Sequence, residues 1–137
     1  MGVNVDNLFV RSSDPDAVLD HLSTLLKRKL VASAAQGGWV QAIAVGEDSP
    51  PEIAQKLSGL LRCEVVCAQL YEVSGDAGWA AFRNGDPLER SHSNSLDDPA
   101  GAVADALARF GIPFRVREFR ELVELSAEGV RTRTPVG

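Results

Sequence analysis

Three stretches of the chain begin with an acidic or hydroxyl residue followed directly by proline, and each continues as an amphipathic helix. The three pairs are Asp14-Pro15, Ser49-Pro50 and Asp98-Pro99. A capping side chain accepts hydrogen bonds from the free amide groups of the first turn, and proline already has the backbone angle of the first helical position. The apolar residues that follow recur at helical spacing on one side only, so each helix needs a flat partner.

The residues at the far end of each apolar stripe predict where the helices end. We expect the first helix to close with Lys27, Arg28 and Lys29 in its last turn, where the helix dipole favours cations. The third helix is expected to stop at Gly111, because glycine readily adopts the left-handed conformation that terminates helices. The first two helices and their flanking segments also repeat at an offset of about 35 residues, which is explained either by duplication or by chance matching of leucines.

Apolar segments between the helices supply the flat partner, a sheet. The strands are expected at residues 7–11, 31–35, 39–45, 64–73, 79–83, 88–92 and 114–122. Asn84-Gly85 joins two of them as a hairpin, because this dipeptide favours two-residue turns, and Pro87 places the second arm at a sheet edge. Segment 64–73 is apolar on both faces near its start, which is typical of a central strand.

The order of these elements predicts an α+β fold. Through residue 73 the order is β-α-β-β-α-β, the order of ferredoxin-like or split βαβ domains, and a β-hairpin, a third helix and a final strand extend it. We expect a mostly antiparallel sheet with the helices on one face and the other face open. One domain is predicted over residues 1–126, followed by a loose C-terminal tail over residues 127–137.

Composition narrows the functional classes. The 137 residues carry a formal net charge of −5, which argues against a nucleic-acid partner. The sequence has neither an apolar run of bilayer length nor a secretory leader pattern, so we expect a cytoplasmic protein without a membrane partner. Cys63 and Cys67 are too few for a disulfide framework and do not match zinc-site spacing. We expect them to pack in the core, with no metal and no cofactor.

A catalytic motif is not evident. His92 lies in the most polar stretch of the chain, residues 90–98, whose serine and aspartate side chains resemble the parts of a nucleophile–base–acid set. A solvated loop that ends in a helix cap explains the same residues. We therefore expect a non-enzymatic domain, and an enzyme with a site around His92 is kept as one alternative.

The candidate binding residues lie on and beside the predicted sheet. Burial of both indoles in the core would explain the two tryptophans, but a sheet face that mixes Trp with Gln and Arg also suits a partner surface. The predicted binding residues are Trp39, Gln41, Trp79, Arg83, Arg90 and His92. The main hypothesis is protein–protein interaction or self-association through an open sheet face or an edge strand. A small-molecule-binding regulatory domain is the other alternative.

Overall fold

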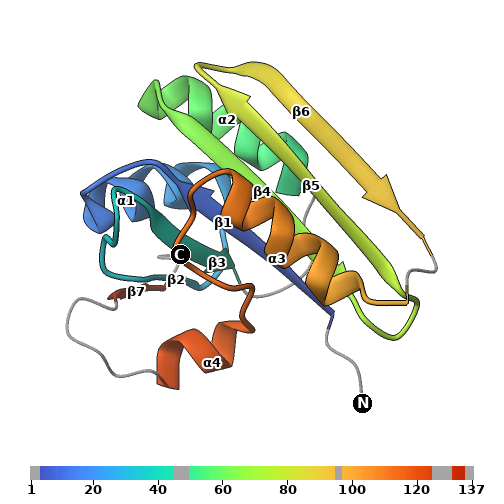
Figure 1. Cartoon of the computed structure of the whole chain (residues 1–137). Coiled ribbons are helices and arrows are strands. Elements are labelled where there is room, and N and C mark those ends of the chain that lie inside the picture. Colours follow the sequence, from blue (N-terminus) through green and yellow to red (C-terminus); the bar gives the residue numbers. More distant parts are fainter. Residues whose placement is uncertain (1–3, 45–49, 95–96, 125–130, 135–137) are drawn as a thin grey trace.

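The computed structural model describes residues 4–44, 50–94, 97–124 and 131–134 and shows an α+β domain (Figure 1). The elements, in chain order, are β1 (Asn4–Val10), α1 (Pro15–Leu25), β2 (Leu30–Ala32), β3 (Val40–Ala44), α2 (Pro50–Leu61), β4 (Glu64–Tyr71), β5 (Asp76–Arg83), β6 (Asp86–Ser93), α3 (Pro99–Arg109), α4 (Phe119–Glu124) and β7 (Arg131–Arg133). None of the helices within these ranges is long and apolar enough to cross a membrane.

One antiparallel sheet organises the domain, with strand order β6-β5-β4-β1-β3-β2-β7. Two strand–helix–strand units interlock in its centre. β3 lies between the two strands joined by α1, and β1 lies between the two strands joined by α2. The β5–β6 hairpin widens the sheet on one side, and β6 is its outer strand, as Pro87 predicts.

Two of the predicted helix caps are confirmed. The Asp14 carboxylate accepts hydrogen bonds from the backbone N–H groups of Asp16 and Ala17, and the Asp98 carboxylate accepts one from Gly101. The third predicted cap, Ser49, lies outside the described residues. Acidic caps satisfy amide groups that have no partner within the helix, so these two helix starts are fixed by local sequence.

The end of the first helix differs from the prediction. α1 stops at Leu25, and the next residue is already extended, with φ −126° and ψ 125°. Lys27, Arg28 and Lys29 therefore lie beyond the helix and not in its last turn. Residues 26–29 form the short connection from the helix to β2, which begins at Leu30.

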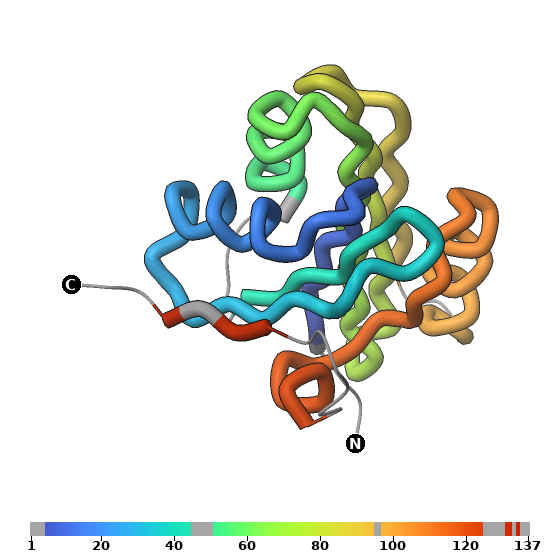
Figure 2. The backbone as a smooth tube through the Cα atoms, turned by 90° about the vertical axis from the view of Figure 1, so that its left-hand side faces the viewer, coloured from blue at the N-terminus to red at the C-terminus, as the bar shows by residue number. Residues whose placement is uncertain are grey.

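Helices cover both faces of the sheet, so the expectation of helices on one face and an open second face is wrong. α1 and α2 lie on one side and α3 on the other (Figure 2). Each face of the sheet carries its own hydrophobic core, the first under α1 and α2 and the second under α3. Successive residues of a strand point to opposite faces, so Leu8 and Val10 of β1 belong to the first core and Phe9 to the second. The run of apolar residues at the start of β4 serves the same two cores.

The C-terminal part of the chain also differs from the prediction. In place of a strand over residues 114–122, residues 112–118 are irregular and α4 follows. Leu122 of α4 packs against Val31 and Ile43, on the side of the sheet that α3 covers. Arg131–Arg133 forms β7 beside β2, so this part of the predicted loose tail 127–137 belongs to the sheet. Positions 127–130 and 135–137 lie outside the described residues.

Candidate functional site

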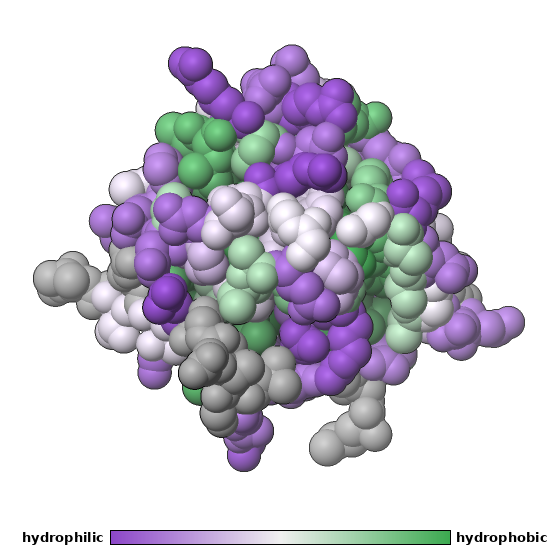
Figure 3. Space-filling model, turned by 60° about the vertical axis from the view of Figure 1, so that its left-hand side comes forward, coloured by the Kyte–Doolittle hydropathy of each residue, from purple (hydrophilic) through white to green (hydrophobic). Residues whose placement is uncertain are grey.

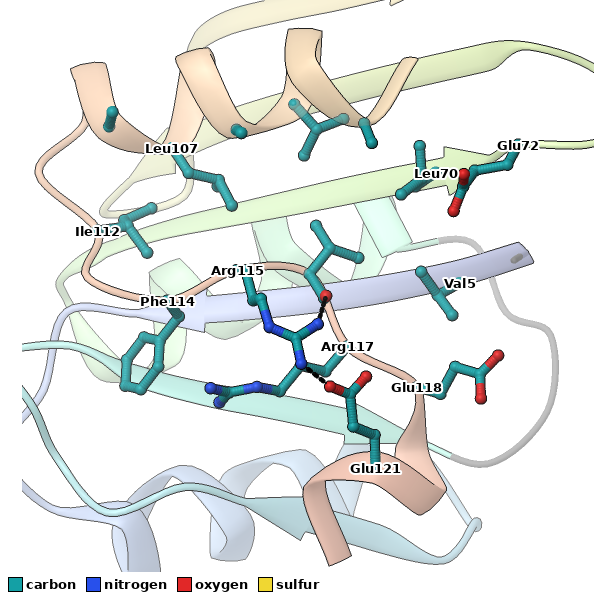
Figure 4. Close-up of a pocket in the computed structure, with 15 residues that line it drawn as sticks. Val5, Leu70, Glu72, Leu107, Ile112, Phe114, Arg115, Arg117, Glu118 and Glu121 are labelled. Atoms are coloured by element: carbon teal, nitrogen blue, oxygen red, sulfur yellow. Dashed lines mark hydrogen bonds and ion pairs between the residues drawn. The ribbon is translucent and has the colours of Figure 1, made fainter. Parts of the chain in front are cut away.

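A groove of about 520 Å³ lies between α3, the sheet and the irregular segment 112–118 (Figure 4). Val5 of β1 and Leu70 of β4 form its floor. Leu107 of α3 and then Ile112 and Phe114 close one end. We call this cavity the α3 groove. Its position follows from the fold, because α3 covers only the β4–β5 part of this sheet face and the segment 112–118 returns beside it.

Small side chains on α3 keep the groove open. Ala100, Ala104 and Ala108 all line it, and all three are exposed. Residues four apart lie above one another on a helix, so these alanines form one shallow stripe along the groove wall. A stripe of larger residues at the same positions would reach across and fill the space.

Two buried amides on the sheet hold the opposite wall in place. The Asn7 side-chain amide donates a hydrogen bond to the Arg117 carbonyl at 2.8 Å, and its oxygen accepts one from the Arg117 backbone N–H at 2.9 Å. Gln41 donates to the Asn7 oxygen at 2.6 Å and to the Arg115 carbonyl at 2.8 Å. Both side chains are buried, so the segment 112–118 supplies the polar partners that this part of the sheet face requires.

Arg115 lies at the rim of the groove, with its guanidinium between two oxygen acceptors. It forms an ion pair with Glu121 of α4 and donates a second hydrogen bond, at 3.4 Å, to the Val116 carbonyl. Figure 4 shows this arrangement near the middle of the lower rim. The side chain is exposed, so solvent screens the pair and its geometry is easily exchanged for another.

Arg117 is a partly buried charged group of the groove with few polar partners. Its guanidinium donates one hydrogen bond, at 3.0 Å, to the neutral amide oxygen of Gln41, and its Nε atom is buried without a partner. Among the residues that the structure describes, no carboxylate lies within ion-pair distance of it. Burial and, next, the charge of Arg115 lower the pKa of Arg117 below its usual value. Arg117 is therefore a cation that lacks an anion.

Two further carboxylates lie at the other end of the groove. Figure 4 shows Glu72 and Glu118 on either side of Val5, away from Ile112 and Phe114. Both are exposed, and no ion pair joins either of them to another residue in the described ranges. The groove therefore has an apolar end, a basic middle and an acidic end.

Trp39 and Gln41, which we predicted on an open sheet face, are both buried. Trp39 is 1% exposed and Gln41 is fully buried. The Arg11 guanidinium lies 5.5 Å from the centre of the Trp39 ring. The partner of the Gln41 side chain is the chain's own segment 112–118, so neither residue is available to an external protein.

Trp79 and its neighbours form a structural clamp. The Trp79 indole N–H donates to the Glu89 carboxylate at 2.8 Å, and the Arg109 guanidinium donates twice to the same carboxylate, at 2.8 and 2.6 Å. These hydrogen bonds, with that from Arg109 the largest cause, lower the pKa of Glu89 from 4.5 to about 2. The clamp ties the last turn of α3 to the edge strand β6.

The other three predicted residues are exposed on the β5–β6 hairpin. Arg83 pairs with Glu64 at 2.6 Å. Arg90 and His92 are exposed on β6. His92 lines neither the α3 groove nor a second cavity of about 400 Å³ beside α2, although Arg90 contributes to the latter. The structure therefore does not bring the six predicted residues together at one site.

The cysteines lie apart from the groove. Cys67 is buried in the core, where burial raises the pKa of its thiol to about 12. Cys63 is half-buried, and burial raises the pKa of its thiol as well. A raised pKa keeps a thiol protonated and unreactive. In the part of the chain that is described, no group of three or more His, Cys, Asp or Glu residues is arranged to hold a metal ion.

The residues that form the α3 groove were mostly missed at the level of sequence. Arg115 and Arg117 fall in the predicted final strand 114–122 and are not among the predicted binding residues, and neither is Asn7. The available signal was Asn7 itself, an amide directly before the apolar residues Leu8, Phe9 and Val10 of a central strand, which needs a polar partner if it is buried. No protein-family model, no curated protein and no solved structure matches the chain.

Proposed function

We propose that the domain is a non-enzymatic binding module that holds a small organic molecule with an apolar body in the α3 groove. The supporting observation is the groove itself, about 520 Å³ of space with apolar side chains on its floor and charged side chains at its rim. Small-molecule sites in proteins typically span about 300–1,000 Å³ and combine an apolar lining with a few polar groups. This proposal takes the small-molecule hypothesis ahead of the protein-partner hypothesis.

We also propose that the central part of the domain is ferredoxin-like. The strand order β4-β1-β3-β2 with antiparallel neighbours, and α1 and α2 on one face, support this assignment. The hairpin and α3 are then additions to that core. The groove forms between α3, the C-terminal segment and strands β1 and β4, so the ligand would bind on the sheet face opposite α1 and α2.

The test fills the groove without disturbing the core. Ala104 is exposed and lines the groove, so Ala104→Phe places a ring in the cavity while the buried face of α3 stays unchanged. Ala104→Ser is the matched control, because serine leaves the space open. A thermal-shift screen of small amphipathic molecules should find compounds that raise the Tm of the wild type and of Ala104→Ser but not of Ala104→Phe. Compounds that stabilise all three proteins equally would argue against the groove.

A protein partner along the β6 edge is the second candidate. β6 is an outer strand of the sheet, and Leu88 on it is 50% exposed. An outer strand can add a strand from another chain through backbone hydrogen bonds. Pro87 and the charges of Glu89 and Arg90 oppose this, since proline and charge on an edge strand discourage pairing. On the face that Figure 3 displays, the hydrophobic patches of the described residues are small and separate.

Sedimentation velocity tests the edge-strand candidate. If β6 pairs with a second copy, the wild type will form a dimer at high concentration, and Leu88→Lys will return it to a monomer. A wild type that stays monomeric at every concentration would exclude self-association through this edge.

We further propose a cytoplasmic location without a nucleic-acid partner. The two free thiols and the net charge of −5 support this.

A further inference from the structure

The middle of the α3 groove holds more positive than negative charge. Arg115 and Arg117 both line it, and their charges act on one another. Only one carboxylate, that of Glu121, is in ion-pair contact with either guanidinium among the described residues. Two cations against one contacting anion, in a partly desolvated place, favour the binding of a further anion.

Arg117 carries this imbalance most clearly. Its hydrogen bond to Gln41 uses a neutral acceptor, and its buried Nε atom has no acceptor at all. An unpartnered buried donor costs free energy in the folded protein. A planar carboxylate suits a guanidinium best, because two parallel N–H···O bonds can form.

The remaining charges limit how many anionic groups the ligand can carry. Glu72 and Glu118 line the far end of the groove, and Glu121 lies beside Arg115. The α3 residues that line the groove carry no charge, as they are alanine, valine and leucine. A second carboxylate that extended toward Glu72 and Glu118 would meet like charge. An uncharged body would instead lie along the alanine stripe and the apolar floor.

From these contacts we infer that the ligand is an organic monocarboxylate with an apolar body. Its carboxylate binds between Arg115 and Arg117, and its hydrocarbon part lies against Leu70, Ala104 and Leu107. This inference rests on the proposed function and adds the charge class of the ligand. Binding transfers the carboxylate from water to the two guanidiniums and involves no covalent step.

Four probes with eight carbon atoms each separate the charge inference from the proposed small-molecule function. They are octanoate, octanamide, octylammonium and the dicarboxylate suberate, each titrated into the wild-type protein by isothermal calorimetry below its aggregation concentration. Octanoate should bind about tenfold or more tightly than each of the other three, because only it places a single carboxylate on the guanidiniums. Octanamide, octylammonium or suberate binding as tightly as octanoate would overturn the charge inference and leave the groove standing. If none of the four binds, both the inference and the proposed small-molecule function are wrong.

Matched arginine variants locate the contact. Arg117→Gln should weaken octanoate binding about tenfold, whereas Arg120→Gln should leave it unchanged. Arg120 is a suitable control because it is an exposed arginine on α4 that pairs with Glu124, outside the groove. Circular dichroism checks that both variants are folded. If Arg117→Gln does not fold, Arg115→Gln replaces it, since its guanidinium is exposed and pairs only at the surface. Equal octanoate affinity in a folded groove variant and in Arg120→Gln would overturn the proposal.

Discussion

Asn7 forms two hydrogen bonds with the backbone of Arg117, which lies 110 positions later in the chain. The Asn7 side chain thus pairs with segment 112–118 as a neighbouring strand would. It donates to the Arg117 carbonyl and accepts from the Arg117 N–H. Gln41 extends the contact to Arg115. One wall of the α3 groove therefore depends on an amide side chain in the first strand of the domain.

Removal of the Asn7 amide should loosen this wall and destabilise the domain. Asn7→Ala removes two hydrogen bonds to Arg117 and one from Gln41, all in a buried place, so we expect the free energy of unfolding to fall by about 2–4 kcal/mol. Urea denaturation followed by fluorescence measures the change. Asn94→Ala, at an exposed asparagine, is the control. An unchanged urea midpoint for Asn7→Ala would show that the amide network is not needed.

Neutralising Glu121 should strengthen binding of a carboxylate ligand. Glu121 forms an ion pair with Arg115, so its carboxylate competes with the ligand for the same guanidinium. Glu121→Gln removes the competing charge and keeps the shape, and we expect a severalfold lower Kd for octanoate by calorimetry. Glu124→Gln, on the same helix but outside the groove, should not change the Kd. Weaker binding to Glu121→Gln would contradict a contact between Arg115 and the ligand.

The Glu89 clamp should make stability depend on acid pH. The pKa of Glu89 falls from 4.5 to about 2 in the folded protein, chiefly through Arg109. A lowered folded-state pKa adds stability above the unfolded-state value, and this addition is lost as the pH falls from about 5 to about 2. The difference in unfolding free energy between wild type and Glu89→Gln should therefore be larger at about pH 7 than at about pH 3.

Urea denaturation of both proteins at the two pH values measures this difference, and Arg109→Gln provides a second check from the other side of the clamp. The Arg109→Gln substitution should make the unfolding free energy depend less on acid pH, because the Arg109 hydrogen bonds are the largest cause of the lowered Glu89 pKa. A gap between wild type and Glu89→Gln that is the same at both pH values would refute the role of this carboxylate.

Two glycines that lie against each other should respond oppositely to alanine. Gly59 is in α2, and a Cβ there would lie 3.6 Å from the Gly85 Cα, an ordinary contact, so Gly59→Ala should stabilise the domain by about 0.5–1 kcal/mol. Gly85 has φ +87° in the hairpin turn, where alanine is strained, so Gly85→Ala should destabilise it by about 1–2 kcal/mol. Thermal unfolding of the two variants tests this, and a shift of Tm in the same direction for both would contradict it.

Local sequence signals predicted the parts of the fold that local physics decides. The Asp14 and Asp98 caps and the Asn84-Gly85 turn each need only neighbouring residues, and each forms as expected. The sides on which the helices pack were not predictable in the same way. An amphipathic stripe shows that α3 needs a sheet but not which face of it, and the loops that precede the helix do not fix that choice.

The alternation of Phe114 and Val116 with two arginines explains why a strand was wrongly predicted over residues 114–122. Period-two alternation is typical of a strand, yet an irregular segment that lies across a sheet face also buries every second residue. Phe114 is buried, and Val116 and Arg117 are half-buried, without a paired strand. The candidate site depends on this segment, and its contacts with Asn7 and Gln41 are too distant in sequence for a local pattern to indicate.

A titration of octanoate followed by backbone amide NMR tests the central claim most directly, because it reports on the whole surface at once. If the α3 groove is the binding site, the shifted amides will cluster at positions 104–108 and 112–118 and near Leu70, and the shifts will saturate. Shifts that gather along β6, or that spread over the surface without saturating, would contradict the account.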